Sequence, residues 1–138
     1  MIKFNVRNQS INRIDGFSPA EGSVNYLIAE FNFKTDDWNG TLKTAIFKNP
    51  SSKKEYDAIL DEDHCVVPWE AISDDGKCEV AVYGLTEDYK ITTDIERFSV
   101  KPTLTGGTAT QEPTPTVYEQ LLEKLNNISG GTFADWGE

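Results

Sequence analysis

Five consecutive residues are the first candidates for chemistry in this sequence. Asp61, Glu62 and Asp63 precede His64, the only histidine, and Cys65 follows it. Carboxylates and an imidazole are ligands that divalent metals bind. One histidine with neighbouring loop acids has no recognised ligand spacing, however, and a solvated hairpin tip has the same composition. Successive strand residues point to opposite faces, so His64 and Cys65 would not meet as base and nucleophile. We expect neither a metal site nor thiol catalysis here.

Other catalytic and binding motifs are incomplete or absent from the sequence. Residues 35–40 (TDDWNG) resemble part of a calcium loop, but Thr35 replaces the first carboxylate and Ile46 replaces the closing glutamate. The sequence has no Walker glycine loop, GxSxG motif or HExxH motif. Its 23 acidic residues offer many carboxylate pairs, so a polysaccharide hydrolase stays open as an alternative. We predict a protein that is not an enzyme and that uses no cofactor.

Large aromatic residues raise another hypothesis, a surface that stacks on sugar rings. Trp38 would be its centre if it lay exposed among tyrosines. Aromatic residues at strand ends more often fill the open ends of a small β-sandwich, and Pro68 before Trp69 interrupts strand pairing and starts a turn. We therefore expect core packing, with a carbohydrate-binding module as an alternative function. The aromatic residues concerned are Trp38, Trp69, Tyr26, Tyr56, Tyr83 and Tyr89.

Composition and charge limit the partners and the compartment. The chain has 138 residues, of which 38% are hydrophobic, and this is enough for one folded domain. Its net charge of −10 opposes binding to nucleic acid or to an anionic membrane surface. No apolar run approaches the roughly 18 residues of a membrane span, and the first residues lack the apolar core of a signal peptide. We expect a protein kept inside a cell or inside an assembly that a cell builds.

The two cysteines, Cys65 and Cys78, are too few for a disulfide framework. Because cysteine packs as a small apolar residue, we expect both thiols to be free and buried. A single bridge between them is the alternative.

Alternation of apolar and polar residues with a period of two predicts a β-rich fold. It is clearest in residues 25–34, where Leu27, Ala29, Phe31 and Phe33 share one face. Turn-forming residues separate seven or eight such strands at roughly 10-residue spacing, which is typical of an antiparallel sandwich or a small barrel. The contiguous apolar residues at 45–47 also predict a strand, one that is covered on both faces inside a sheet. The further strands are expected at residues 2–7, 45–47, 55–60, 76–83 and 98–100.

Composition changes after Lys101 and divides the chain into four parts. Residues 1–101 form the predicted β-sandwich domain, and residues 102–116, rich in Pro, Thr and Gly, form a predicted linker. Residues 117–128 are predicted to be an amphipathic association helix. Residues 129–138 are expected to be a flexible tail.

The limits of the helix follow from the residues that flank it. Thr116 and Glu119 have the spacing of a capping box. Pro113 and Pro115 prevent an earlier start, and the glycines at 130–131 end the helix.

Apolar residues of this helix lie along one stripe. A lone helix of this length is marginal in water, so the stripe must be buried. Because a long linker separates it from the sandwich, we expect several copies to share it, which makes the protein a homo-oligomer. The alternative is that the helix docks on its own sandwich. Phe133 and Trp136 in the tail are possible anchors on a neighbouring molecule. The predicted interface consists of Val117, Tyr118, Leu121, Leu122, Leu125 and Ile128.

Several short motifs together resemble small structural proteins of tailed phages that infect Gram-positive bacteria. The greatest similarity is to the N-terminal domain of phage baseplate upper proteins, over roughly residues 25–128. In those proteins too, a helix with the pattern Tyr-Glu-x-Leu-Leu often follows a Thr/Pro-rich connector. The motifs here are VPWE at 67–70, a glycine-led strand ending in VYG at 82–84, ITT at 91–93 before a strand ending at Val100, and YEQLL at 118–122.

The resemblance implies an immunoglobulin-like antiparallel β-sandwich, followed by a linker and one C-terminal α-helix, that acts as an assembly module. Such modules are commonly three-fold and join the particle to a fibre or a receptor-binding protein. We therefore expect a virion structural protein, made in the cytoplasm of the bacterial host, that forms a trimer and binds other phage structural proteins. Baseplate upper proteins continue into a further domain after the helix, and this sequence departs from that pattern. Three roles therefore stay open: a baseplate or tail connector, a head-fibre protein and a capsid-decoration protein.

Overall fold

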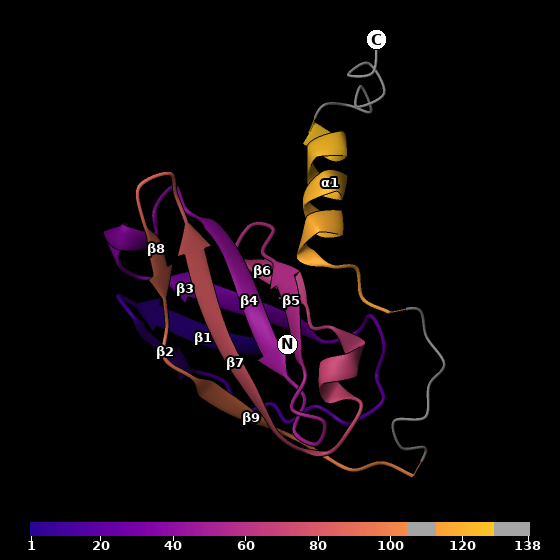
Figure 1. The fold of residues 1–138 in the computed structure, drawn as a ribbon. Coiled ribbons are helices and arrows are strands. Elements are labelled where there is room, and N and C mark those ends of the chain that lie inside the picture. The colour runs from indigo at the N-terminus through magenta and orange to yellow at the C-terminus, as the bar shows by residue number, and fades with distance from the viewer. Residues whose placement is uncertain (105–112, 129–138) are drawn as a thin grey trace.

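The computed structural model describes residues 1–104 and 113–128. Within them, two β-sheets face each other and one α-helix stands at their side, with its C-terminal end beyond the sheets (Figure 1). The strands are β1 (Ile2–Arg7), β2 (Ser10–Arg13), β3 (Ile28–Phe33), β4 (Leu42–Lys48), β5 (Glu55–Ile59), β6 (His64–Val66), β7 (Gly76–Leu85), β8 (Lys90–Thr92) and β9 (Glu96–Val100). The helices are the 3₁₀ turns η1 (Asp36–Trp38) and η2 (Trp69–Ile72) and the α-helix α1 (Val117–Ile128).

One sheet has the strand order β2-β1-β3-β6, and the other has the order β5-β4-β7-β8. The long strand β7 pairs with β8 through residues 83–85 and with β9 through residues 76–80, so β8 and β9 share one edge. The predicted antiparallel arrangement is wrong for one pair, because β1 and β3 are parallel. Because β2 runs antiparallel to β1, it ends beside the start of β1, and residues 14–27 then carry the chain to the other side of β1, where β3 begins at the same end of the sheet. The β-rich, two-sheet prediction is confirmed.

Aromatic rings fill the space between the two sheets. The ring centroids of Phe4 and Phe31 are 5.1 Å apart, and those of Phe33 and Trp38 are 5.0 Å apart. Trp38 is fully buried, and its Nε1 donates a hydrogen bond to the backbone oxygen of Asn8 at 2.8 Å. The expected core packing of Trp38 is confirmed, and a sugar-stacking role for this residue is wrong because no face of its ring is accessible.

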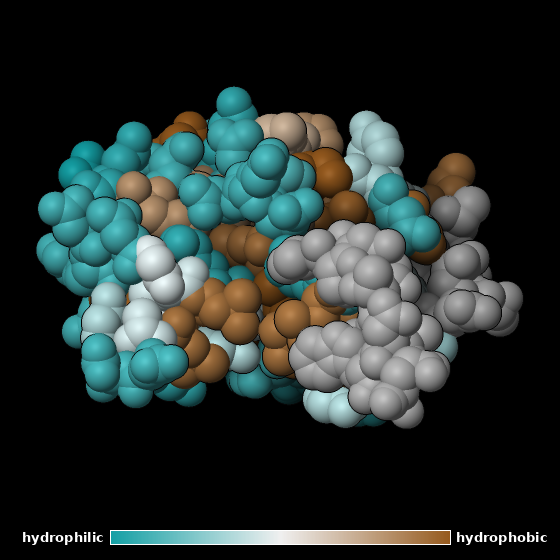
Figure 2. Space-filling view, turned by 90° about the horizontal axis from the view of Figure 1, so that it is seen from above, coloured by the Kyte–Doolittle hydropathy of each residue, from teal (hydrophilic) through white to brown (hydrophobic). Residues whose placement is uncertain are grey.

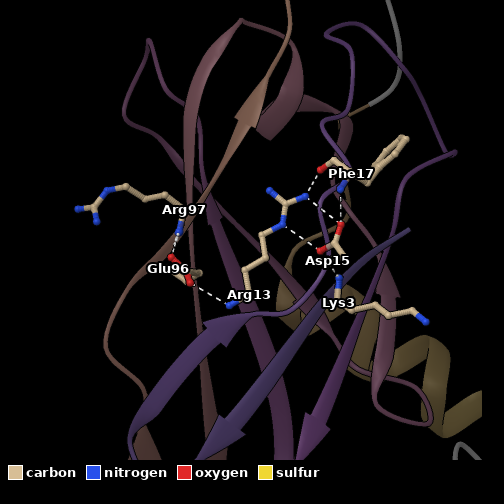
Figure 3. Close-up of polar contacts among 6 residues, drawn as sticks. All are labelled: Lys3, Arg13, Asp15, Phe17, Glu96 and Arg97. Atoms are coloured by element: carbon tan, nitrogen blue, oxygen red, sulfur yellow. Dashed lines mark hydrogen bonds and ion pairs between the residues drawn. The ribbon is translucent and has the colours of Figure 1, made fainter.

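Carboxylates from the second sheet complete the free edge of β2. Asp94, in the break between β8 and β9, accepts a hydrogen bond from the backbone N–H of Ile11 at 3.0 Å. Glu96 of β9 accepts one from the backbone N–H of Arg13 at 2.8 Å (Figure 3). Along this edge, the side chains of Asp94 and Glu96 occupy the place of a neighbouring strand and join the two sheets.

Asp15 anchors the segment that leaves β2. Its carboxylate accepts hydrogen bonds from the backbone N–H of Lys3 at 2.9 Å, from the backbone N–H of Phe17 at 2.8 Å and from the guanidinium of Arg13 at 2.9 Å (Figure 3). Arg13 also donates to the backbone oxygen of Phe17. Burial by itself would raise the pKa of Asp15, but these hydrogen bonds and the Arg13 charge outweigh it and hold the pKa well below its usual 3.8.

We predict that Asp15→Asn lowers the free energy of unfolding by about 2 kcal/mol at pH 7, because the charged acceptor of these bonds is lost. A carboxyl whose pKa is depressed in the folded state contributes stability above its unfolded pKa. That contribution is lost as the pH falls from about 4 toward the folded pKa. Urea unfolding at several pH values should therefore show the two proteins converging in acid. A difference that stays constant down to about pH 2.5 would contradict this assignment.

Candidate association surface

The N-terminus of α1 is capped as its sequence predicts. The backbone N–H of Thr116 donates to Glu119 Oε1 at 2.9 Å, and the backbone N–H of Glu119 donates to Thr116 Oγ1 at 3.2 Å. These hydrogen bonds with Thr116 also lower the pKa of Glu119. The predicted capping box and the predicted helix at residues 117–128 are confirmed.

The helix touches the β-domain (residues 1–101) with its polar side. The side-chain amide of Gln120 lies against β5, where Oε1 accepts from the backbone N–H of Ile59 and Nε2 donates to the backbone oxygen of Asp57, both at 2.8 Å. Both backbone groups belong to the edge of β5 that faces away from β4. One turn further along the helix, Lys124 Nζ lies 3.8 Å from Asp61 Oδ1. The Asp61 side chain is 78% exposed, so this ion pair contributes little.

The segment before α1, residues 113–116, is also attached to the β-domain. Glu70 of η2 accepts the backbone N–H of Thr114 on Oε2 at 2.8 Å and the Thr114 hydroxyl on Oε1. At the other end of the predicted linker, the backbone N–H of Thr103 donates to Glu21 Oε1 at 2.9 Å. Both described ends of the linker are therefore hydrogen-bonded to the β-domain, whereas residues 105–112 lie outside the described residues.

Two apolar residues of α1 are exposed on the side away from Gln120. Tyr118 is 70% exposed and Leu125 is 46% exposed. At 100° per residue, these two side chains are about 160° and 140° around the helix from Gln120. Leu121 and Leu122 are partly buried. We call the side that carries Tyr118, Leu121, Leu122 and Leu125 the apolar side of α1.

The other four residues predicted for the interface and the tail do not all fall on described side chains. Val117 lines a hollow between α1 and β5 together with Tyr56 and Glu70, so it borders the β-domain rather than the apolar side. Ile128 ends the helix, but its side chain lies outside the described residues. Phe133 and Trp136 also lie outside them. The predictions for Ile128, Phe133 and Trp136 stay predictions.

Beside α1 is a groove that the sequence did not predict. It has a volume of about 570 Å³ and lies between the edges of β5 and β6, the 113–116 segment and α1. Seen from above, apolar surface is exposed between the hydrophilic loops (Figure 2). The apolar side chains that line the groove are Ala58, Ile59, Val66, Val67, Pro68 and Trp69, and the polar ones include Gln120 and Glu123.

The residues first considered for chemistry lie in different environments. Cys65 of β6 is buried, and burial raises the pKa of its thiol to about 12, as it also does for Cys78 of β7. Both thiols are free, which confirms that prediction. His64 lies at the partly exposed end of β6 with its Nδ1 3.2 Å from the backbone oxygen of Glu62. Within residues 1–104 and 113–128, no three His, Cys, Asp or Glu side chains are grouped so as to hold a metal ion.

The other aromatic residues lie in separate parts of the fold. Trp69 begins η2 directly after Pro68, as the predicted turn requires. The ring of Tyr83 has Lys90 Nζ 4.9 Å from its centroid, and the hydroxyl of Tyr89 donates to the backbone oxygen of Asp37 at 2.7 Å. Trp69 thus belongs to a turn, the Tyr83 contact joins β7 to β8, and the Tyr89 contact joins the residue before β8 to η1.

Comparison with known proteins identifies no family. A scan against protein-family models finds no match, and a search of curated proteins finds no relative. None of the helices in the described part of the chain has both the length and the apolar character of a membrane span. The contacts and exposure of α1 are therefore the main basis for a functional proposal.

We predict that Thr116→Ala weakens α1 by about 1 kcal/mol, because a capping hydroxyl is lost. Amide hydrogen exchange in the first turns of α1 should then be roughly fivefold faster. Thr92→Ala in β8 is the matched control and should leave exchange in α1 unchanged. Equal exchange rates in α1 for Thr116→Ala and the wild type would show that the cap does not stabilise the helix.

Proposed function

We propose that the protein is a non-enzymatic assembly protein whose copies associate through the apolar side of α1. The observation that carries this proposal is the orientation of the helix. Gln120 and Lys124 face the β-domain, whereas Tyr118 is 70% exposed and Leu125 is 46% exposed. A 12-residue helix is marginal in water without a packed apolar side. Equivalent helices from other copies would bury this side and stabilise it.

The spacing of the apolar residues supports a bundle of helices. Tyr118, Leu121 and Leu125 follow one another at intervals of three and four, as the a and d positions of a coiled coil do, and Ile128 continues the series. Leu122 lies beside this seam. A seam of this length is short, but symmetry repeats the contact, so that each helix packs against more than one neighbour in the assembly. We propose a trimer, the state that the resemblance to baseplate upper proteins implies.

The proposed setting is the virion of a tailed phage, with a role as a baseplate or tail connector. The motifs VPWE at 67–70 and YEQLL at 118–122 support it, and so does a β-rich domain that precedes a single helix. In this proposal the β-domain has an immunoglobulin-like topology and contacts other phage structural proteins. A head-fibre or capsid-decoration protein would use the same parts.

We predict that the double change Leu121→Asp and Leu125→Asp converts an oligomer to monomers, because buried carboxylates in the bundle would repel one another. Light scattering after size exclusion would measure the mass, and near-ultraviolet circular dichroism would show that the β-domain is still folded. Leu104→Asp, at an exposed leucine outside the helix, is the matched control and should leave the mass unchanged. An unchanged mass in the double variant would reject the proposal, and a lower melting temperature at constant mass would indicate docking on the same chain.

The phage setting needs a separate test. Antibodies against the β-domain should label particles of the parent phage at one fixed position in electron micrographs. Labelling at the tail tip supports a baseplate or tail connector, and labelling over the capsid supports the head alternatives. Purified particles that contain none of the protein would overturn the virion proposal without affecting the association proposal.

A further inference from the structure

We infer that Gln120 and Glu70 are positioning residues for self-association, which hold α1 so that its apolar side faces away from its own β-domain. This inference rests on the proposed function, because it assumes that copies meet through α1. It goes further by assigning the orientation of the helix to two polar contacts outside the apolar side.

The Gln120 amide fixes the rotation of α1 about its own axis. One side chain bonds three backbone atoms, because Nε2 donates to the oxygens of Asp57 and Pro115 and Oε1 accepts from the N–H of Ile59. The two bonds to β5 reproduce the exchange that a neighbouring strand would make with this edge. A rotation of α1 that brought Leu121 toward β5 would break both of these bonds and leave edge groups of β5 without their present partner.

Glu70 fixes the point at which the chain enters α1. Its two carboxylate oxygens hold the backbone N–H and the hydroxyl of Thr114, and bonds to a charged acceptor are stronger than neutral ones. Pro113 and Pro115 flank Thr114, and their rings restrict the backbone on both sides of the contact. The first turn of the helix therefore starts from a defined place on η2.

The groove beside α1 explains why such positioning is needed. Its walls include Ala58, Val66, Val67 and Trp69, and Gln120 lies at its margin. A helix free to turn could place Leu121 or Leu122 in this groove and bury its apolar side within its own subunit. Polar anchoring at β5 and η2 opposes that competing arrangement and keeps the apolar side available for other copies.

The experiment compares Gln120→Ala and Glu70→Gln with the wild type by sedimentation equilibrium. Alanine is the best helix former, so weaker association of Gln120→Ala cannot come from a less stable helix. We expect the dissociation constant to rise roughly fivefold to tenfold in each variant, because ordering of the helix must now be achieved on binding. Lys124→Ala is the matched control on the same side of α1. Its ion pair with Asp61 is exposed, so the dissociation constant should change less than about twofold.

A second measurement reports orientation without association. Spin labels on Thr92→Cys and Asn126→Cys are placed in the monomeric Leu121→Asp and Leu125→Asp background, where the buried native thiols stay unlabelled. A narrow distance distribution between the two labels should broaden or shift when Gln120→Ala is added, and Lys124→Ala should leave it narrow.

The outcomes separate the two proposals. Unchanged dissociation constants and an unchanged distance distribution in Gln120→Ala, with association still abolished by the two aspartates, would overturn the positioning role alone. A wild-type chain that is monomeric at all concentrations would overturn the proposed function and the inference with it, whatever the spin labels report.

Discussion

Backbone hydrogen bonding at the edges of the two sheets is the constraint on which the rest of this structure depends. A sheet edge exposes N–H and C=O groups that another chain could pair with. Here side chains bind such groups: Asp94 and Glu96 accept from β2, and Gln120 both donates to and accepts from β5. The β2 side is bound from within the β-domain, whereas the β5 side is bound by the helix. The place of α1 is therefore set by the edge that it completes.

This division of roles explains how one short helix can be attached to its own domain and still offer the association surface that we propose. The attachment uses hydrogen bonds, which are directional and need little apolar area. The apolar residues Tyr118 and Leu125 are left on the other side. If α1 packed on the β-domain through its leucines, the side chains that a bundle requires would be buried within the same subunit. Attachment through Gln120 leaves them for the contacts between copies that we propose.

Much of the fold was predictable because its signals are local. Alternation with a period of two located β1, β3, β5, β7 and β9, and a contiguous apolar run located β4. Thr116 with Glu119 predicted both the cap and the start of α1. The strands β2, β6 and β8 have only three or four residues, too few for alternation to be recognised. The parallel pairing of β1 with β3 depends on the path of residues 14–27, which leaves no periodic pattern.

The candidate site was predictable only on its apolar side. Leucines at intervals of three and four are a pattern, and they predicted an amphipathic helix that has to associate. Gln120 looks like any solvated polar residue of such a helix, and its partners are backbone atoms of Asp57 and Ile59, which any residue type supplies. The contact between Glu70 and Thr114 is also absent from any local pattern, because these residues are 44 positions apart in the sequence. Orientation of a helix on a sheet is decided by such long-range polar contacts, and these become visible only once the edge of β5 and the path of the chain are known.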